Sequence, residues 1–94
     1  MIIDGNLRTL IEVVMEVGML WLDNDSHTEL SVRIARAADY YRLKYGVAPD
    51  LCLVHPSMLS GHPDLVVGRS GTIAVRPNRA ILPGHLWIGR ADKN

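Results

Sequence analysis

The sequence predicts an α/β fold, and three observations indicate it. Two short apolar segments, residues 19–23 and 51–55, have the length and composition of buried strands. Residues 27–45, which join them, carry apolar side chains at helical spacing. Turn-forming residues divide the chain after residue 56 into further short apolar segments. We therefore expect the order helix, strand, helix and four strands (α-β-α-β-β-β-β), with a small mixed sheet of about five strands. A two-layer α+β arrangement would also fit.

The composition is that of one small globular domain. The chain has 94 residues, enough for a single core, so we expect residues 1–94 to form one domain. Hydrophobic residues make up 48% and charged residues 21%, which excludes a disordered chain. Ten basic and ten acidic residues cancel. No net charge therefore attracts the protein to nucleic acid or to a membrane.

Cysteine content and hydropathy indicate the compartment. The single cysteine, Cys52, excludes an intrachain disulfide and a four-cysteine zinc site. Charged residues interrupt the N-terminal segment where a secretory signal would be apolar. No apolar run approaches the roughly 20 residues of a membrane helix. We therefore expect a cytoplasmic protein with no membrane segment.

Residues 5–17 have apolar side chains at helical spacing, with charged residues on the opposite face. Asp4 is a suitable cap for the start of a helix, and Gly18 is suitable for its end. An extended strand over residues 12–17 is the alternative. We expect the helix.

The second helix has the clearest signals in the chain. Ser26 and Glu29 have the spacing of a capping box, which predicts a helix over residues 27–45. Gly46 then ends this helix. With the apolar segments on either side, it forms a strand–helix–strand unit. We expect its two strands to lie parallel and side by side in one sheet.

The remaining elements are short. Residues 55–63 are predicted to form a loop, in which one helical turn can open at Pro56. Residues 65–68 and 72–76 flank a glycine-containing turn and predict a hairpin. Pro83-Gly84 is a strong turn signal before a last strand over residues 85–89.

The strand at residues 19–23 predicts self-association. Its side chains are apolar on both alternating sides, so both faces of the sheet need cover. Two helices on one face would leave an apolar patch on the other, which normally marks an interface. We therefore expect a two-fold homodimer. The alternative is a monomer with one helix on each face.

Polar side chains follow both strands of the strand–helix–strand unit, at the sheet edge where open α/β sheets bind ligands. The candidate ligand-binding residues there are Asp23, Asp25, Ser26, His27, His55 and Ser57. Asp23 beside His55 would form a carboxylate–imidazole pair suited to general base catalysis, which makes these two the catalytic candidates. Aspartates with a histidine also suit a divalent metal, and the helix start suits a phosphate. A local role in capping is the alternative.

Several named motifs are excluded. Residues 23–27 begin like a calcium loop but lack its sixth-position glycine, and no phosphate loop, GxGxxG or HExxH occurs. Cys52 and His55 are three residues apart in one strand, so they point to opposite faces. We therefore expect a buried, inert Cys52, and neither a metal nor another cofactor.

A basic stripe on the second helix supports a nucleic-acid alternative. Residues at three- and four-residue intervals would track phosphates, together with arginines near the hairpin. They are Arg33, Arg36, Tyr40, Lys44, Arg76 and Arg79. A solvated helix face is the simpler interpretation. The near-neutral pI of 6.9 favours it, because nucleic-acid-binding domains typically have a pI above about 9.

These observations favour a small homo-oligomeric binding or accessory module without catalysis. One alternative is a metal-dependent hydrolase, or a phosphate- or nucleotide-binding enzyme, that uses Asp23, Asp25 and His55. Another is a nucleic-acid-associated protein that uses the basic stripe. The small size argues against an enzyme, because no second domain is available to close over a substrate. The expected partner is a second copy of the chain.

Overall fold

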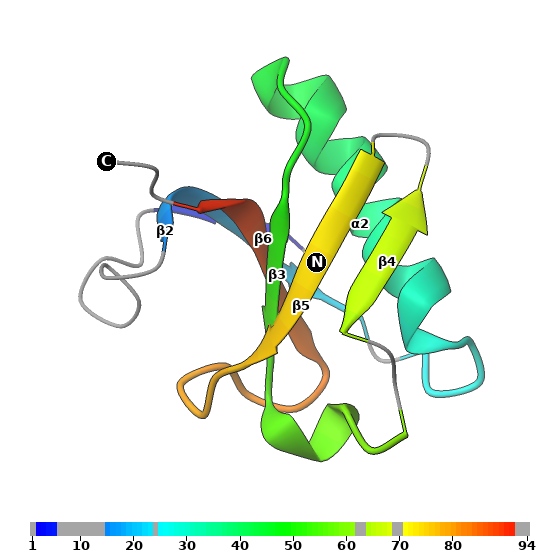
Figure 1. Ribbon diagram of the computed structural model, residues 1–94. Coiled ribbons are helices and arrows are strands. Elements are labelled where there is room, and N and C mark those ends of the chain that lie inside the picture. Colours follow the sequence, from blue (N-terminus) through cyan, green and yellow to red (C-terminus); the bar gives the residue numbers. More distant parts are fainter. Residues whose placement is uncertain (1, 6–14, 24, 62–63, 69–70, 92–94) are drawn as a thin grey trace.

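One α-helix lies across one face of a mixed β-sheet in this computed structural model of the chain (Figure 1). The structure describes residues 2–5, 15–23, 25–61, 64–68 and 71–91. Its elements in chain order are β1 (Ile2–Gly5), β2 (Met15–Leu22), α2 (Leu30–Tyr45), β3 (Leu51–Val54), the 3-10 turn η1 (Pro56–Met58), β4 (Leu65–Gly68), β5 (Gly71–Pro77) and β6 (His85–Ala91).

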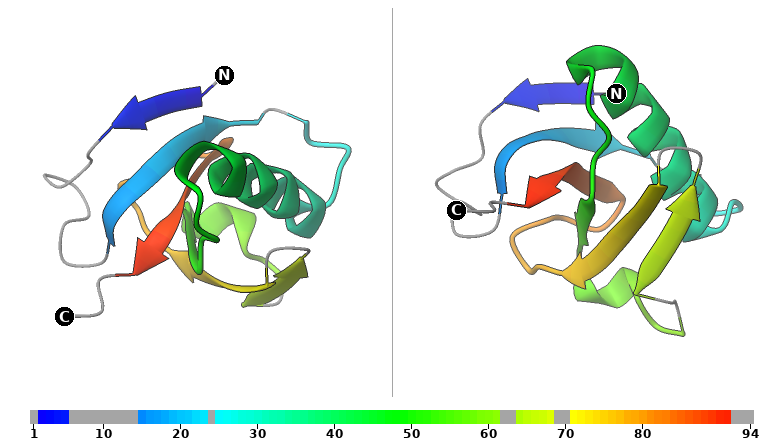
Figure 2. Two further views of the ribbon diagram at one scale, coloured as in Figure 1. Left: turned by 90° about the horizontal axis from the view of Figure 1, so that it is seen from above. Right: turned by 45° about the horizontal axis from the view of Figure 1, so that its top comes forward.

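The six strands have the spatial order β1-β2-β6-β3-β5-β4, which Figure 2 shows from two directions. β3 and β5 are parallel, and the other neighbouring pairs are antiparallel. β2 and β3 run in the same direction, as predicted, because each is antiparallel to β6. The prediction that they are neighbours is wrong, since β6 lies between them. β6 suits this central place because Leu86, Trp87 and Ile88 make it apolar on both faces, and residues 86–89 are all buried there.

The predicted first helix is contradicted at both of its ends. Gly5 ends β1, and Met15 begins β2, which pairs antiparallel with β1. The rest of that prediction, residues 6–14, lies outside the described residues. The alternative strand fits here, because β2 gains backbone hydrogen bonds from a strand on each side. The described chain therefore begins with a strand and contains one α-helix and six strands, where we predicted two helices and about five strands.

α2 buries the predicted face. Of the six residues predicted on this face, Leu30, Ile34, Ala37, Ala38 and Tyr41 are buried. Tyr45, the sixth, is half-buried and packs against the same cluster. The helix also ends as predicted: Gly46 has φ 76°, and its N–H donates to Arg42 O at 2.8 Å.

The predicted start of α2 is wrong. Its first residue is Leu30, and the cap residue Glu29 makes no side-chain hydrogen bond to the helix. The capping box of Ser26 and Glu29 does not form because Asp25 organises this turn instead. Its carboxylate accepts hydrogen bonds from the Thr28 hydroxyl and from the His27 N–H.

The other predicted elements are confirmed. β3, β4, β5 and β6 match the predicted segments to within two residues at either end, and η1 is the helical turn expected after residue 55. The described residues include no helix that is both long and apolar enough to span a membrane.

Apolar side chains form a cluster on each face of the sheet. The larger cluster joins α2 to the sheet, and the smaller one contains Leu51, Leu53, Ile81 and Trp87. No described α-helix covers this second face, yet Leu53 and Trp87 are each only 1% exposed. The centre of this face is therefore buried within the single chain, whereas the sequence led us to expect an exposed apolar patch there.

Candidate functional site

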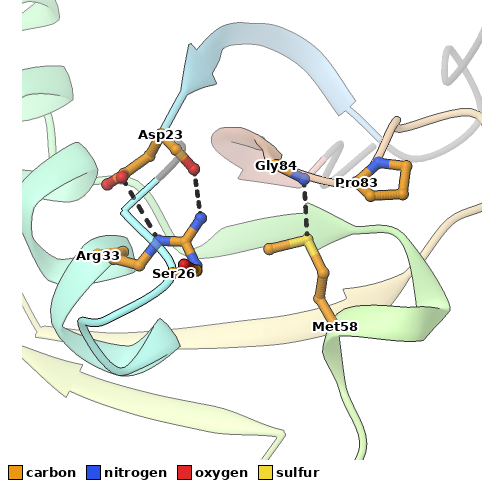
Figure 3. A pocket seen from close by; sticks show the side chains of 6 residues that line it. All are labelled: Asp23, Ser26, Arg33, Met58, Pro83 and Gly84. Atoms are coloured by element: carbon orange, nitrogen blue, oxygen red, sulfur yellow. Dashed lines mark hydrogen bonds and ion pairs between the residues drawn. The ribbon is translucent and has the colours of Figure 1, made fainter.

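A hollow of about 360 Å³ lies at the sheet edge where β2 ends and β6 begins (Figure 3). The residues that line it come from β2's end, the turn before α2, the first turn of α2, η1 and the turn before β6. They are Asp23, Ser26, Arg33, Met58, Pro83 and Gly84. This is the edge at which the sequence predicts a ligand site.

One wall of the hollow is an ion pair between Asp23 and Arg33. Arg33 Nε lies 3.6 Å from Asp23 Oδ1, and each side chain is only 9% exposed. Arg33 Nη2 also donates a hydrogen bond to the backbone carbonyl of Asp23, and the Asp25 N–H donates to Asp23 Oδ1 at 2.9 Å. Nε itself is buried and has no hydrogen-bond partner among the described residues. The wall is therefore fixed in place and carries no net charge.

The opposite wall is largely apolar and consists of Met58, Pro83 and Gly84. The Gly84 N–H donates to Met58 Sδ at 3.4 Å, and the Gly84 carbonyl accepts from the Asp23 N–H at 2.9 Å. Gly84 has φ 84°, a conformation that glycine adopts without strain. These hydrogen bonds join η1, the end of β2 and the start of β6, so the three segments that line the hollow are fixed relative to one another.

Asp25 holds the turn before α2 and does not line the hollow. Its carboxylate accepts from Thr28 Oγ1 at 2.5 Å and from the His27 N–H at 3.2 Å, and it lies 3.8 Å from Arg36 Nη1. The hydrogen bond from Thr28 is the main cause that lowers the pKa of Asp25 below its ordinary value of 3.8. Of the other candidates in this turn, Ser26 lines the hollow and His27 is exposed.

We expect Thr28→Val to raise the pKa of Asp25, because valine has nearly the shape of threonine but no hydroxyl donor. A carboxyl with a lowered folded pKa stabilises the fold above its unfolded pKa and loses that contribution as the pH falls through the folded value. The variant should therefore be less stable than wild type above about pH 3.8. This difference should disappear as the pH falls below the lowered pKa that Asp25 has in the folded wild type. A pH titration of the Asp25 carboxyl by NMR measures the shift, and Thr28→Ser, which keeps the donor, is the control. An Asp25 that titrates identically in wild type and Thr28→Val would contradict this role.

His55 and Ser57 lie together but outside the hollow. His55 Nδ1 accepts a hydrogen bond from the Ser57 N–H at 3.1 Å and lies 2.8 Å from Ser57 Oγ, so His55 caps η1. Asp23 and His55 follow strands that are separated by β6, which places these strands roughly 10 Å apart. The structure therefore brings Asp23 to the hollow with Ser26, and brings His55 to Ser57. It does not join Asp23 and His55 in one hydrogen-bonded pair among its described contacts.

The predicted basic stripe is divided. Arg33 is 8% exposed and faces Asp23. The other three members, Arg36, Tyr40 and Lys44, are exposed. Tyr40 is 40% exposed and contacts Trp21, with ring centroids 5.5 Å apart.

The two arginines expected near the hairpin, Arg76 and Arg79, lie on and just after β5, which forms that hairpin with β4. Arg76 is on β5 and donates to the backbone carbonyls of Asp64 and Val75, and Arg79 follows β5 on the exposed surface. The surface stripe on α2 is shorter than the sequence indicates because Arg33 is buried against Asp23.

Cys52 is buried, as predicted. It is 0% exposed, and burial raises the pKa of its thiol because the charged thiolate is disfavoured away from water. Among the described residues no three His, Cys, Asp or Glu side chains gather closely enough to hold a metal ion.

Comparisons with protein-family models, with curated proteins and with solved structures give no match for this chain, so its function is inferred from the residues and contacts above.

Proposed function

We propose that this chain is a homo-oligomeric binding module without catalysis, and that it takes a small uncharged polar ligand in the hollow. The observation that carries the proposal is the buried Asp23–Arg33 pair in one wall, opposite the apolar wall of Met58 and Pro83. The volume of about 360 Å³ falls in the range of roughly 300–1,000 Å³ that is typical of small-molecule sites.

The charges of the wall favour an uncharged ligand. A phosphate attracted by Arg33 would also meet the carboxylate of Asp23, which lies 3.6 Å from the guanidinium. A metal ion attracted by Asp23 would meet the guanidinium in the same way. Each charge opposes the ion that the other attracts. A neutral molecule with a hydrogen-bond donor and an acceptor can use both residues at no such cost, while its apolar part contacts Met58 and Pro83.

The contacts of the catalytic candidates favour binding over catalysis. The His55 imidazole is bonded to Ser57 in its own turn, two strands from Asp23. The Asp23 carboxylate is held by Arg33 and by the Asp25 N–H. A general base must lie within hydrogen-bond reach of the proton that it removes. His55 does not line the hollow, so it cannot take a proton from a ligand there, and Asp23 lacks the imidazole partner that the predicted carboxylate–imidazole base requires.

The experiment uses N-methylacetamide, an uncharged probe with one donor and one acceptor, added to the isotope-labelled protein. We expect saturable shifts of the Ser26 and Gly84 amide signals in NMR spectra, with a Kd on the order of 1 mM, about −4 kcal/mol. Ser26→Phe should abolish these shifts, because Ser26 lines the hollow and a phenyl ring there occupies it. Ser60→Phe, at an exposed position that does not line the hollow, should leave them unchanged.

Inorganic phosphate and Mg²⁺, titrated separately, distinguish the alternatives. We expect neither ion to shift the two amide signals at concentrations where the neutral probe does. Preferential binding of phosphate or Mg²⁺ at these amides would contradict the proposed ligand class and would support the enzyme alternative. Shifts that persist in Ser26→Phe would place the bound probe outside the hollow. The homo-oligomeric part of the proposal is tested separately below.

A further inference from the structure

β4 forms one edge of the sheet. It is the last strand in the spatial order, and its described pairing is with β5 (Figure 1). An edge strand presents backbone donors and acceptors to which another strand can add.

The register of β4 against β5 shows which backbone groups point outward. The Val75 N–H donates to the Asp64 carbonyl at 2.8 Å, so these two residues form a hydrogen-bonded pair just before β4 begins. Hydrogen-bonded and non-hydrogen-bonded pairs alternate along an antiparallel ladder. Val66 and Gly68 therefore direct their N–H and C=O groups toward β5, whereas Leu65 and Val67 direct theirs away from the sheet.

Apolar side chains flank this edge on both faces of the sheet. Leu65 is 52% exposed on the face without an α-helix, since it lies opposite Ala74, which packs against the cluster on that face. On the other face, Val32 of α2 is 44% exposed. The Ala35 Cβ is 3.8 Å from the position that a Cβ on Gly68 would take, so this part of α2 packs beside β4. Val32 lies one helical turn before Ala35 and is therefore on the same side of α2.

The sequence of β4 carries none of the residues that commonly protect an edge. Its four residues, LVVG, include no charge and no proline. A second copy of the same edge supplies matching groups, because a two-fold axis places the outward donors of one strand opposite the outward acceptors of the other.

We propose that β4 pairs antiparallel with β4 of a second copy around a two-fold axis at Val66. Leu65 then lies opposite the partner's Val67, and the outward N–H and C=O groups of these residues form four backbone hydrogen bonds across the axis. The exposed side chains of Leu65 and Val32 lose water on the two faces. This inference rests on the proposed homo-oligomer and names the surface through which it forms.

The contact is small beside the roughly 1,600 Å² that a standard stable interface buries, so the dimer is reversible. We expect a dissociation constant on the order of 10–100 µM, about −5 to −7 kcal/mol. Sedimentation equilibrium of the full chain from about 5 µM to 1 mM spans this range. Wild type should change from monomer to dimer across it.

Two variants test the edge. Val67→Pro removes the outward N–H while leaving the bonds to β5, and proline is tolerated on an edge strand where its missing N–H faces outward. Leu65→Lys puts a charge next to the two-fold axis, opposite the partner's Val67. Each should weaken dimerisation at least tenfold, whereas Val67→Ala, which keeps the N–H, should weaken it much less. NMR amide spectra check that each variant is folded. If Val67→Pro does not fold, Leu65→Lys alone tests the β4 contact.

The outcomes separate this inference from the proposed function. A wild-type protein that stays monomeric at 1 mM overturns both the β4 pairing and the homo-oligomeric part of the proposed function. The β4 edge would then be available to pair with a strand of another protein. A wild-type dimer that Leu65→Lys and Val67→Pro leave unchanged overturns the β4 pairing alone. Probe binding in the hollow is measured on dilute, monomeric protein and is independent of both results.

Discussion

Gly18→Ala is expected to lower the free energy of unfolding by about 3 kcal/mol, a large part of the roughly 5–15 kcal/mol that stabilises a small domain. A Cβ on Gly18 would lie 1.9 Å from the Trp87 ring, well inside van der Waals contact. Trp87 is 1% exposed and packed among other side chains, so its ring cannot move aside without disrupting the second apolar cluster. Overpacking of this kind typically costs about 1–3 kcal/mol, and occasionally more. The contact here is between a Cβ, which is fixed to the backbone, and a buried ring, so we expect the upper end of that range. Urea unfolding followed by circular dichroism measures the loss.

Gly68→Ala is the matched control for this prediction. Gly68 is also a strand glycine, but a Cβ there would lie 3.8 Å from the Ala35 Cβ, an ordinary contact. Alanine in a strand loses less conformational freedom on folding than glycine does, so we expect a change within about 1 kcal/mol, toward higher stability. A Gly18→Ala protein that unfolds at the same urea concentration as Gly68→Ala would show that Trp87 is not confined as the structure places it.

The sequence predicts well those elements that local signals define. The buried face of α2 follows from its apolar spacing. Gly46 marks the end of the helix because the residue that follows its last turn needs a positive φ. Pro56 and Pro83 mark the turns that border η1 and β6. Each of these signals acts within a few residues, so no knowledge of the sheet is needed to interpret it.

Strand order depends on contacts between distant residues, which spacing along the chain does not contain. The position of β6 between β2 and β3 follows from the burial of both its faces and from pairings such as Leu20 with Trp87. The same non-local pairing explains the error at residues 15–17, where helical spacing gives way to a strand. Tertiary context overrides weak local preference in such segments.

The candidate site is partly predictable for the same reason. Asp23 and Ser26 follow from the rule that ligands bind at the carboxyl ends of strands, and both line the hollow. Arg33 was assigned to an exposed stripe by its spacing from Arg36. Yet it also lies three residues after Leu30 and four before Ala37, at the border of the buried face. An arginine in that position indicates a buried partner, and this signal could have identified it.

Arg33→Met is the second variant for which we expect a large loss of stability, about 3 kcal/mol. Methionine keeps much of the apolar stem of arginine but leaves the Asp23 carboxylate, whose side chain is 9% exposed, without its cation. Breaking a buried ion pair by removing one partner typically costs about 3–5 kcal/mol, because an uncompensated charge remains away from water. Urea unfolding at pH 7 measures the effect.

The comparison with Arg36→Met shows whether the loss of stability in Arg33→Met comes from the burial of the ion pair or from the loss of a positive charge alone. Arg36 also pairs with an aspartate, Asp25, at 3.8 Å, but its side chain is 54% exposed and the pair is screened by water. We expect its unfolding midpoint to remain close to that of wild type. The double variant Asp23→Asn/Arg33→Met removes both charges and should recover part of the stability that Arg33→Met loses, which a double-mutant cycle measures as coupling between the two residues. Equal losses in Arg33→Met and Arg36→Met, or no coupling in the cycle, would mean that Asp23 and Arg33 do not form the neutral wall on which the proposed ligand class depends.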